Sequence, residues 1–397
     1  MTDLSRRVVA VLSGLTAATV LAACGGSGLD KGGSSGSGGS GGGSAAVDIG
    51  LLLPQSGVYA PLGKDMEQGF KLCLDQKGGS LGGHKINIKQ VDEGGGPDTG
   101  VPAAQKLVQS NVKAVVGVVN SATVLGVKDL FTESKIPLIV ANAGADSITG
   151  KAASEYVWRT SFANGEISAA MGKYLAGRVK GGVYLLAADY AGGKEHLGAF
   201  RPAFEAAGGK IVGEAYTPFG TTQNFQPFLE RAKQSGAKAI YVFYAGSEAV
   251  TFVKQYAELG LKGTIPLFAP GFLTEGGVLA AQGNTAVGVE TALHYSTALD
   301  TPANKKFVTD YTAVAQKPPT VYSVQAYDAC QVLDKALAKG TDGPRIIEGL
   351  KSIDKVDSPR GEFKFSAGHG PDQTYYLRKV AEVNGVLTNT VVQKLNK

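Results

Sequence analysis

Short hydrophobic runs alternate along this chain with longer stretches in which hydrophobic residues recur every three or four positions. Residues 47–53 are almost continuously apolar, which is typical of a strand buried on both faces. Met66, Phe70, Cys73 and Leu74 then recur at helical spacing. Further strands are expected at 84–91, 113–119, 137–143, 182–188, 210–216, 238–244 and 265–269, with helical patterns between them. This alternation predicts an α/β fold with parallel sheets flanked by helices.

The size and charge of the chain narrow the possible partners. About 350 residues follow position 46, more than one hydrophobic core normally serves, so two lobes are expected. The net charge of +5 comes from 39 basic and 34 acidic residues that form no basic run. We therefore expect no nucleic-acid partner.

The N-terminus has the features of a bacterial lipoprotein signal. Arg6-Arg7 precede an apolar stretch at 8–20, and Leu21-Ala22-Ala23 stand directly before Cys24. This pattern predicts a signal peptide over residues 1–23 and lipidation of Cys24. The alternative is an ordinary secretory signal that happens to contain a cysteine. If Cys24 is lipidated, we expect the mature protein to be anchored at the extracytoplasmic face of the cell membrane, in a periplasm or at the cell surface.

The segment after Cys24 has the composition of a flexible tether. Residues 25–46 include eleven glycines and six serines. The remaining apolar residues are too few to build a core. We therefore expect residues 24–46 to be a linker between the lipid and the folded body.

Small polar residues follow several of the predicted strands. Asn120 to Thr123 follow the strand at 113–119, and Asn142 to Asp146 follow the strand at 137–143. Ligands of parallel sheets gather at these strand ends, and a helix that begins there favours an anion. Ser121 is thus a candidate ligand for a carboxylate. The alternative is that Ser121 and Thr123 only cap their helix.

No set of residues typical of catalysis or metal binding is found in the sequence. There is no Gly-x-Ser-x-Gly motif and no Cys-x-x-Cys pair, and glycines 94–96 lack the Gly-Lys-Ser/Thr ending of a phosphate loop. No histidine has another His or a Cys three or four positions away; the histidines are His84, His196, His294 and His369. We expect a binding protein that is not an enzyme and uses no cofactor or metal.

The order of several motifs resembles that of the branched-chain amino-acid (Leu/Ile/Val)-type periplasmic binding proteins, which have the type I periplasmic binding fold and serve ABC importers. The motifs are residues 50–54, Ser56-Gly57, the helix at 63–75, Gly117 with Ser121, 137–143, Trp158-Arg159-Thr160, Ala188-Asp189-Tyr190 with Gly193, and 326–329. The resemblance implies two Rossmann-like lobes joined by three crossover hinge strands near 158–163, 292–296 and 357–361. Closure of the lobes would enclose the ligand.

The same resemblance implies a discontinuous domain layout. The N-terminal lobe would comprise residues 47–160 plus 296–357, and the C-terminal lobe residues 161–295 plus 358–397. The partners would be a small solute and an ABC permease in the membrane, and the protein would be a monomer. The helices that carry Cys73 and Cys330 would lie side by side, so a disulfide between them is expected; two buried thiols are the alternative.

Several residues occupy positions that bind or cover the ligand in this family. Ser121 would hold the carboxylate of the solute, and a backbone group of Ala143 would join it. Leu62 would cover the ligand, and Tyr190 and Ser247 would line the cleft. These assignments favour a carboxylate-bearing solute such as a branched-chain amino acid.

Two positions depart from the amino-acid-binding pattern. Gly144 replaces a frequent threonine, and Gly271 lies where the acid that binds the α-ammonium is usual. A buried ammonium without such an acid costs several kcal/mol. Either another acid replaces it, for which the candidates are Asp189, Glu166 and Glu248, or the ligand has no ammonium.

An aromatic acid would suit walls built from Phe272, Tyr190 and Tyr244. An amide or urea is a further ligand that relatives of the family take up. A ligand sensor with the same closure, and an extracellular enzyme of similar architecture, remain as other functions.

Overall fold

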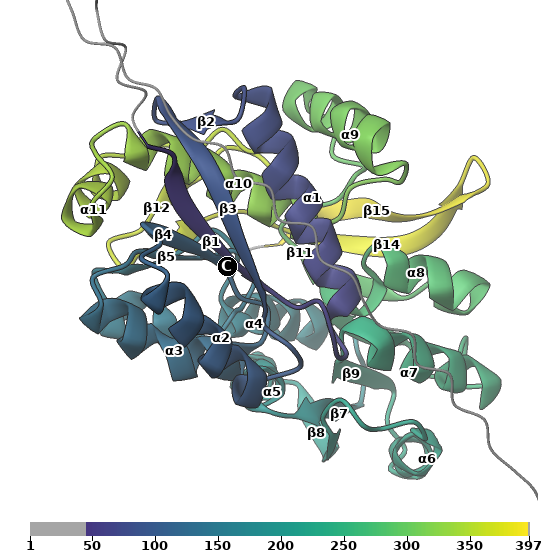
Figure 1. Ribbon diagram of the computed structural model, residues 1–397. Coiled ribbons are helices and arrows are strands. Elements are labelled where there is room, and N and C mark those ends of the chain that lie inside the picture. The colour runs from purple at the N-terminus through teal and green to yellow at the C-terminus, as the bar shows by residue number, and fades with distance from the viewer. Residues whose placement is uncertain (1–44, 396–397) are drawn as a thin grey trace, which may run out of the picture. The chain divides into compact units, whose positions relative to one another are not determined.

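The computed structural model describes residues 45–395, and these residues form one compact unit (Figure 1). The predicted signal peptide, Cys24 and nearly all of the linker lie outside the described residues. Within 45–395, no helix is both long enough and apolar enough to cross a membrane.

The first of two main sheets is built by the N-terminal part of the chain. Its strand order is β2-β3-β1-β4-β5-β6, and all neighbours are parallel except β2 and β3. The strands are β1 (Val47–Leu53), β2 (Ser80–Leu81), β3 (His84–Asp92), β4 (Ala114–Gly117), β5 (Leu138–Val140) and β6 (Val157–Arg159). β1 is buried on both faces, as its apolar run predicts: Ile49 and Leu51 join one hydrophobic core, and Leu52 joins the core on the other face.

Helices cover both faces of this first sheet (Figure 1). α2 (Pro97–Gln109) and α3 (Ser121–Glu133) lie on one face, and α1 (Ala60–Gln76) and α10 (Val321–Leu337) lie on the other. α9 (Pro302–Ala315) and α11 (Gly343–Lys351) pack beside α1 and α10. Cys73 of α1 and Cys330 of α10 form a disulfide across 257 positions of sequence, with 6.1 Å between their Cα atoms.

The second sheet has the order β15-β14-β11-β10-β9-β7-β8. Its strands are β7 (Gly182–Asp189), β8 (Lys210–Pro218), β9 (Ala239–Phe243), β10 (Leu267–Pro270), β11 (Glu290–Leu293), β14 (Tyr375–Val383) and β15 (Val386–Leu395). Its helices are α4 (Asn164–Ala176), α5 (Ala191–Ala206), α6 (Gln226–Gln234), α7 (Gly246–Glu258) and α8 (Gly277–Gln282). β12 (Lys364–Phe365) and β13 (Pro371–Asp372) form a small separate sheet. The predicted α/β class is therefore confirmed.

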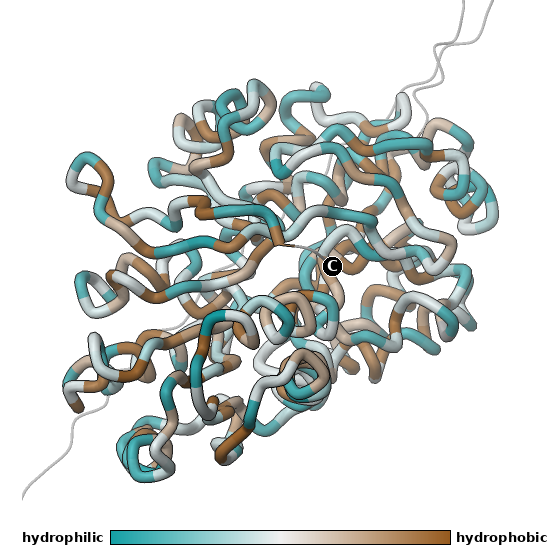
Figure 2. The backbone as a smooth tube through the Cα atoms, turned by 180° about the vertical axis from the view of Figure 1, so that it is seen from behind, coloured by the Kyte–Doolittle hydropathy of each residue, from teal (hydrophilic) through white to brown (hydrophobic). Residues whose placement is uncertain are grey.

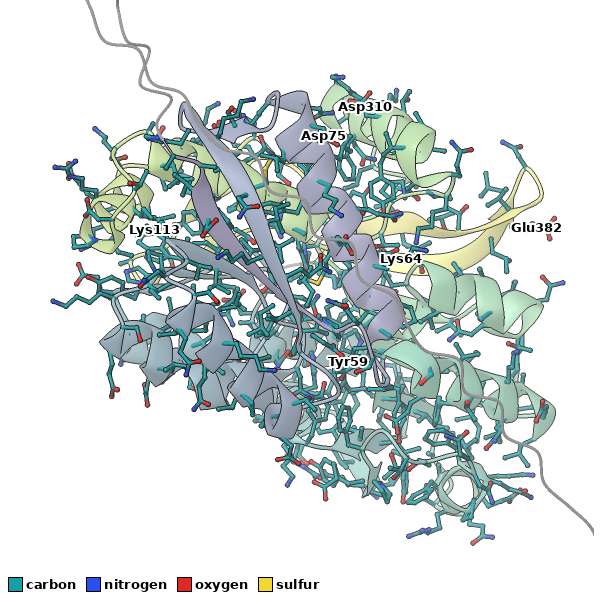
Figure 3. The ribbon with its side chains drawn as sticks, viewed as in Figure 1. Tyr59, Lys64, Asp75, Lys113, Asp310 and Glu382 are labelled. Atoms are coloured by element: carbon teal, nitrogen blue, oxygen red, sulfur yellow. A yellow bond between two sulfur atoms is a disulfide. The ribbon has the colours of Figure 1, made fainter. Side chains whose placement is uncertain are left out.

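The edge of the second sheet differs from the prediction of parallel strands. β14 pairs antiparallel with both β11 and β15, and β14 and β15 form a hairpin that was not predicted. Its turn, Asn384-Gly385, has φ values of 52° and 78°, the left-handed conformation that a two-residue hairpin turn requires. Figure 3 shows Glu382 near the tip of this hairpin, and Figure 2 shows hydrophobic and hydrophilic residues following one another closely along it.

The chain passes between the two sheets three times. It leaves the first sheet after β6, returns after β11 to form the helices around α1, and re-enters the second sheet at β14. The first and last passages contact each other, because Arg360 donates hydrogen bonds to the carbonyl oxygens of Thr160 (2.6 Å) and Ser161 (3.3 Å). The proposed domain boundaries stay predictions.

Candidate functional site

The loop between β4 and α3 presents a serine hydroxyl at the edge of the first sheet. The side chain of Asn120 caps α3 by accepting hydrogen bonds from the backbone N–H groups of Ala122 (2.8 Å) and Thr123 (3.2 Å). Ser121 is therefore not needed as the cap. Its buried hydroxyl accepts a hydrogen bond from Nδ2 of Asn164 at 3.2 Å. The O–H of Ser121 can thus donate to a ligand.

A buried acid that the sequence analysis missed holds this loop. The carboxyl group of Glu93 accepts hydrogen bonds from the backbone N–H groups of Val119 (2.7 Å) and Asn120 (2.8 Å). Glu93 is fully buried, and burial raises its pKa to about 8. It therefore holds a proton at neutral pH and positions the backbone before Ser121 without adding a charge.

Gly144, after β5, is a glycine because its neighbours fill the space of a side chain. A Cβ atom at this position would lie 2.1 Å from Oδ1 of Asn164 and 2.4 Å from the ring of Phe162. The ring of Phe162 thus occupies the room into which a side chain at position 144 would extend. An apolar surface takes the place of the threonine expected in amino-acid binders.

Aromatic rings from the second sheet and the passage before it continue this apolar surface. The ring centroids of Phe162 and Phe272 are 4.6 Å apart, those of Phe272 and Phe243 6.3 Å, and those of Phe243 and Tyr190 6.2 Å. Three of these rings lie at strand ends: Phe272 follows β10, Phe243 ends β9 and Tyr190 directly follows β7. Strand ends thus bring the rings together.

These groups from both sides surround one cavity of about 20 Å³. It is lined by Tyr59, Leu62, Val119, Ser121, Asn142, Gly144, Phe162, Asn164, Tyr190, Phe243, Ala245, Phe272 and Tyr322. Figure 3 shows Tyr59 at the beginning of α1. The volume suffices for about one water molecule. A larger ligand can enter only if the lobes part and aromatic side chains move.

Hydrogen bonds between the two sides hold the lobes closed. The hydroxyl of Tyr59 donates to the hydroxyl of Tyr190 at 2.9 Å. On the side of α3 and α5, the backbone N–H of Asp146 donates to Oε2 of Glu195 at 3.1 Å, and the N–H of Gly165 donates to Oδ1 of Asp146 at 2.9 Å. Burial keeps the pKa of Tyr59 well above its usual value, so its hydroxyl stays protonated.

The position expected for an ammonium-binding acid cannot hold one. A Cβ atom on Gly271 would lie 2.3 Å from Nη2 of Arg378 and 2.7 Å from Cβ of Leu293. The carbonyl oxygen of Gly271 accepts a hydrogen bond from Arg378 instead, at 3.1 Å. Gly271 is therefore part of the support behind the cavity.

The candidate replacement acids also do not line the cavity. Asp189 is exposed and pairs with Lys194 at 2.8 Å. Glu166 accepts a hydrogen bond from the hydroxyl of Tyr375 at 3.0 Å, and Glu248 accepts one from a backbone amide at 2.9 Å. Burial raises the pKa of Glu248 to about 7. In the described part of the chain, no acid faces this cavity.

The cavity brings together part of the predicted site. The predicted residues that line it are Leu62, Ser121, Gly144, Tyr190 and Phe272, and those that do not are Ala143, Asp189, Ser247 and Gly271. The N–H of Ala143 donates a hydrogen bond to the carbonyl oxygen of Val118 at 2.8 Å. The N–H of Ser247 donates one to the carbonyl oxygen of Val58 at 3.4 Å. Tyr244, a predicted wall residue, is buried in the core of the second sheet.

Other wall residues were missed in the sequence analysis. Tyr59 directly precedes α1, which has a proline in its first turn, and Tyr322 lies in the first turn of α10, which follows prolines. Proline at such a place is a recognisable signal for a helix start. Phe162 and Asn164 lie in and just after the first passage between the sheets. Within residues 45–395, no group of three or more His, Cys, Asp or Glu side chains could hold a metal ion.

Two α/β lobes that close over a small cavity at their strand ends are the arrangement expected of a type I periplasmic binding protein. Residues 46–385 match the family described as periplasmic binding protein. The chain is 31% identical over 362 residues to the Leu/Ile/Val-binding protein homolog 6 of Brucella melitensis, covering 88% of this chain and 92% of that protein.

Solved structures of ABC-transporter solute-binding proteins are also similar. One from R. palustris in complex with benzoate is 36% identical, with a TM-score of 0.83, and covers 88% of this chain and 97% of that chain. One from Rhodopseudomonas palustris BisB5 in complex with 3,4-dihydroxybenzoic acid is 33% identical, with the same TM-score and coverage. The chain belongs to the periplasmic binding protein family, as a solute-binding protein of the type that works with ABC permeases. The predicted resemblance to type I proteins is thereby confirmed.

Proposed function

We propose that this protein binds a small aromatic carboxylate between its lobes and delivers it to an ABC permease. The observation that carries the proposal is the lining of the cavity, in which aromatic rings surround hydroxyl and amide groups. Among residues 45–395, no Asp, Glu, Lys or Arg lines it. The benzoate and 3,4-dihydroxybenzoate complexes of the two Rhodopseudomonas relatives support this ligand class.

The carboxylate would bind at the end of the cavity formed by Ser121. The Ser121 hydroxyl accepts from Asn164 and can donate its own hydrogen to a carboxylate oxygen. The first turn of α3 adds a partial positive charge at the same place. The carboxylate would therefore be bound by hydrogen bonds and by the partial positive charge at the start of α3, without a cationic side chain.

An amino acid fits this cavity less well than an aromatic acid does. Its ammonium would lose its water without meeting an acid, which costs several kcal/mol. Phe162 beside Gly144 and Arg378 beside Gly271 fill the space in which polar or acidic side chains would stand. A branched-chain amino acid remains the second candidate ligand, because the Brucella relative carries the name of a Leu/Ile/Val-binding protein homolog.

The location is inferred from the N-terminal sequence, and the domain layout is inferred from the resemblance to the family. We infer that Cys24 carries the lipid, that residues 24–46 tether the body to the extracytoplasmic face of the membrane, and that the protein acts as a monomer. We further infer lobes of residues 47–160 plus 296–357 and 161–295 plus 358–397. The three passages between the sheets support this division.

A thermal-shift series on the purified protein tests the ligand class. We expect benzoate to raise the melting temperature, and we expect leucine, benzamide and urea to leave it unchanged. Benzamide is the matched control, because it keeps the ring and removes the carboxylate charge. Stabilisation by leucine without stabilisation by benzoate would overturn the proposal.

Two further measurements separate the proposed function from its alternatives. Mass spectrometry of the released ligand should recover benzoate unchanged, whereas an enzyme would convert it. Import into vesicles that contain the permease should require this protein. A sensor would bind the same ligand without supporting import.

A further inference from the structure

Asn164, at the start of α4, connects the ligand cavity to a carboxylate that lies outside it. Its side-chain nitrogen Nδ2 donates one hydrogen bond to Oγ of Ser121 at 3.2 Å and one to Oε2 of Glu195 at 2.7 Å. Ser121 and Asn164 line the cavity, and Glu195 does not. Glu195 lies on α5, which packs against α4. A chain of hydrogen bonds thus runs from α5 through Asn164 to the Ser121 hydroxyl.

Glu195 determines which end of the Asn164 amide faces Ser121. An asparagine amide has a donor end and an acceptor end of nearly the same shape, and a half-turn exchanges them. In the turned amide, Oδ1 of Asn164 would take the place of Nδ2 beside Oε2 of Glu195. Two acceptors at that distance repel each other, whereas the nitrogen can donate to both of its neighbours. Glu195 therefore selects the orientation in which Nδ2 faces Ser121.

Other contacts hold both partners of this pair in place. Oε2 of Glu195 also accepts a hydrogen bond from the backbone N–H of Asp146 at 3.1 Å, and a backbone N–H cannot become an acceptor. Asn164 is buried, and its own backbone N–H donates to the carbonyl oxygen of Gly144 at 2.8 Å. These contacts fix Oε2 as an acceptor and fix the position of the amide next to it.

The orientation of this amide decides what the Ser121 hydroxyl can offer a ligand. A hydroxyl group has a single hydrogen. Because Ser121 accepts from Asn164, that hydrogen is free to be donated to a ligand atom. If the amide were turned, the hydroxyl would donate to Oδ1 of Asn164 and present only lone pairs to the ligand. A carboxylate, which is an acceptor, would then be repelled.

The hydrogen bond between Asn164 and Glu195 lies on one side of the closure. α4 and α5 both pack on the second sheet, whereas Ser121 follows a strand of the first sheet. When the lobes part, the bond between Asn164 and Glu195 would persist, and the one between Asn164 and Ser121 would break. The amide is therefore oriented before it meets Ser121, which reduces the cost of ordering the site on closure.

Resting on the proposed function, we propose that Glu195 is a positioning residue, which orients the Asn164 amide so that the Ser121 hydroxyl donates its hydrogen to the anionic group of the ligand. It acts through Asn164 and does not reach the cavity itself. The site thus obtains a hydrogen-bond donor for an anion from a carboxylate placed behind an amide.

The charge of Glu195 opposes this effect, because a negative charge near the cavity disfavours an anionic ligand. Two features reduce the charge. Burial raises the pKa of Glu195, and the guanidinium of Arg159, which is itself buried, offsets part of the negative charge. The orienting effect acts through direct hydrogen bonds, so we expect it to outweigh the repulsion. Variants that separate the acceptor from the charge can decide between the two effects.

Calorimetric titration with benzoate tests the inference on the unaltered protein, Glu195→Met and Glu195→Gln. Methionine has a similar length but no strong acceptor, so the amide of Asn164 can turn. We expect Glu195→Met to bind benzoate about tenfold more weakly. Glutamine keeps an acceptor oxygen and removes the charge, so Glu195→Gln should recover most of that loss. If repulsion by the charge dominated, both variants would bind benzoate more tightly than the unaltered protein.

A double-mutant cycle with Ser121→Ala separates an orienting role from a purely structural one. With alanine at position 121 no hydroxyl remains to be oriented, so Glu195→Met should weaken benzoate binding by less than about twofold in that background. The exposed backbone N–H of Asp146 can turn to water when Glu195 is replaced, so its loss should add little. A purely structural role would weaken binding by the same factor in both backgrounds.

Glu205→Met is the matched control, because Glu205 lies on the same helix, is exposed and pairs with Arg201 at 3.5 Å. It should bind benzoate as the unaltered protein does. Glu195 is only partly buried, so its variants should fold, which circular dichroism checks. If Glu195→Met binds benzoate at least as tightly as the unaltered protein, or loses the same factor in both backgrounds, the inference is overturned and the proposed function stands. If the unaltered protein does not bind benzoate, the proposed function fails and the inference fails with it.

Discussion

Arg360, in the last passage between the sheets, and Tyr322, in the wall of the cavity, are both buried polar residues, but their surroundings differ. Arg360 forms an ion pair with Asp328, with Nε 3.2 Å from Oδ2 and with 1% and 0% of the two side chains exposed. This contact is electrostatic, because Nε of Arg360 and Oδ1 of Asp328 have no hydrogen-bond partner. It also donates to the carbonyl oxygens of Thr160 and Ser161. Tyr322 has a hydroxyl without any protein partner.

This difference separates a part that connects the lobes from a part that receives a ligand. A connection that must persist as the lobes move gains from partners supplied by the protein itself. A binding site gains from a group whose partner arrives with the ligand, because the ligand then relieves an unfavourable burial. The buried Arg360–Asp328 pair thus lies at a connection, whereas the described residues that line the ligand cavity are uncharged.

Arg360→Met should have the largest effect on stability. It leaves Asp328 buried at full depth without its cation, and we expect a loss of about 3–5 kcal/mol in the free energy of unfolding. Denaturant unfolding followed by circular dichroism measures this loss. The double variant Arg360→Met/Asp328→Asn should recover part of it, because no unpaired charge remains.

The matched control for this prediction is Lys364→Met. Lys364 pairs with Asp354 at 2.9 Å, but both side chains are largely exposed. Its unfolding midpoint should not change measurably. Equal losses in Arg360→Met and Lys364→Met would show that burial of the Arg360 pair does not stabilise the connection.

Ser121→Ala should have the next largest effect, and on binding instead of folding. Removal of the hydroxyl leaves a ligand carboxylate oxygen without its donor, whereas Nδ2 of Asn164 keeps its hydrogen bond to Oε2 of Glu195 at 2.7 Å. We expect benzoate affinity to fall by about 1–3 kcal/mol. Calorimetry measures the affinity, and Ser247→Ala, outside the cavity, is the control. An unchanged affinity in Ser121→Ala would exclude this serine as the carboxylate ligand.

The sequence was sufficient for most of the sheets because their strands are buried on both faces. Such strands read as apolar runs, and the predicted run at 47–53 coincides with β1. The hairpin β14–β15 was missed although Asn384-Gly385 is a strong turn signal. Its strands are partly exposed, so hydrophobic residues do not form a continuous run there.

The site was predictable where a single strand end determines it. Ser121, Gly144 and Phe272 lie within four residues after the ends of β4, β5 and β10, and these residues line the cavity. Tyr59 and Tyr322 do not follow strands and are 263 positions apart, the difference between their residue numbers. Their meeting depends on the packing of α1 beside α10, a contact between distant segments that no local pattern encodes.

The pH dependence of stability shows whether Glu93, the buried acid that holds the loop before Ser121, is neutral in the folded protein. Its usual pKa of 4.5 is raised to about 8 in the folded protein. Between these values the folded state binds a proton that the unfolded state has released, so stability falls as pH rises through this interval. The contribution is at most about 1.4 kcal/mol per pH unit.

Glu93→Gln replaces the protonated carboxyl with a neutral group of the same shape. We expect melting temperatures measured between pH 6 and pH 8 to fall less steeply in this variant than in the unaltered protein. Glu155→Gln, at an exposed acid that pairs with Lys351, should leave the slope unchanged. A slope that is equal in Glu93→Gln and the unaltered protein would mean that Glu93 is ionised at neutral pH. The loop before Ser121 would then hold a buried anion, and the contrast between a charged connection and an uncharged cavity side would not extend to this loop.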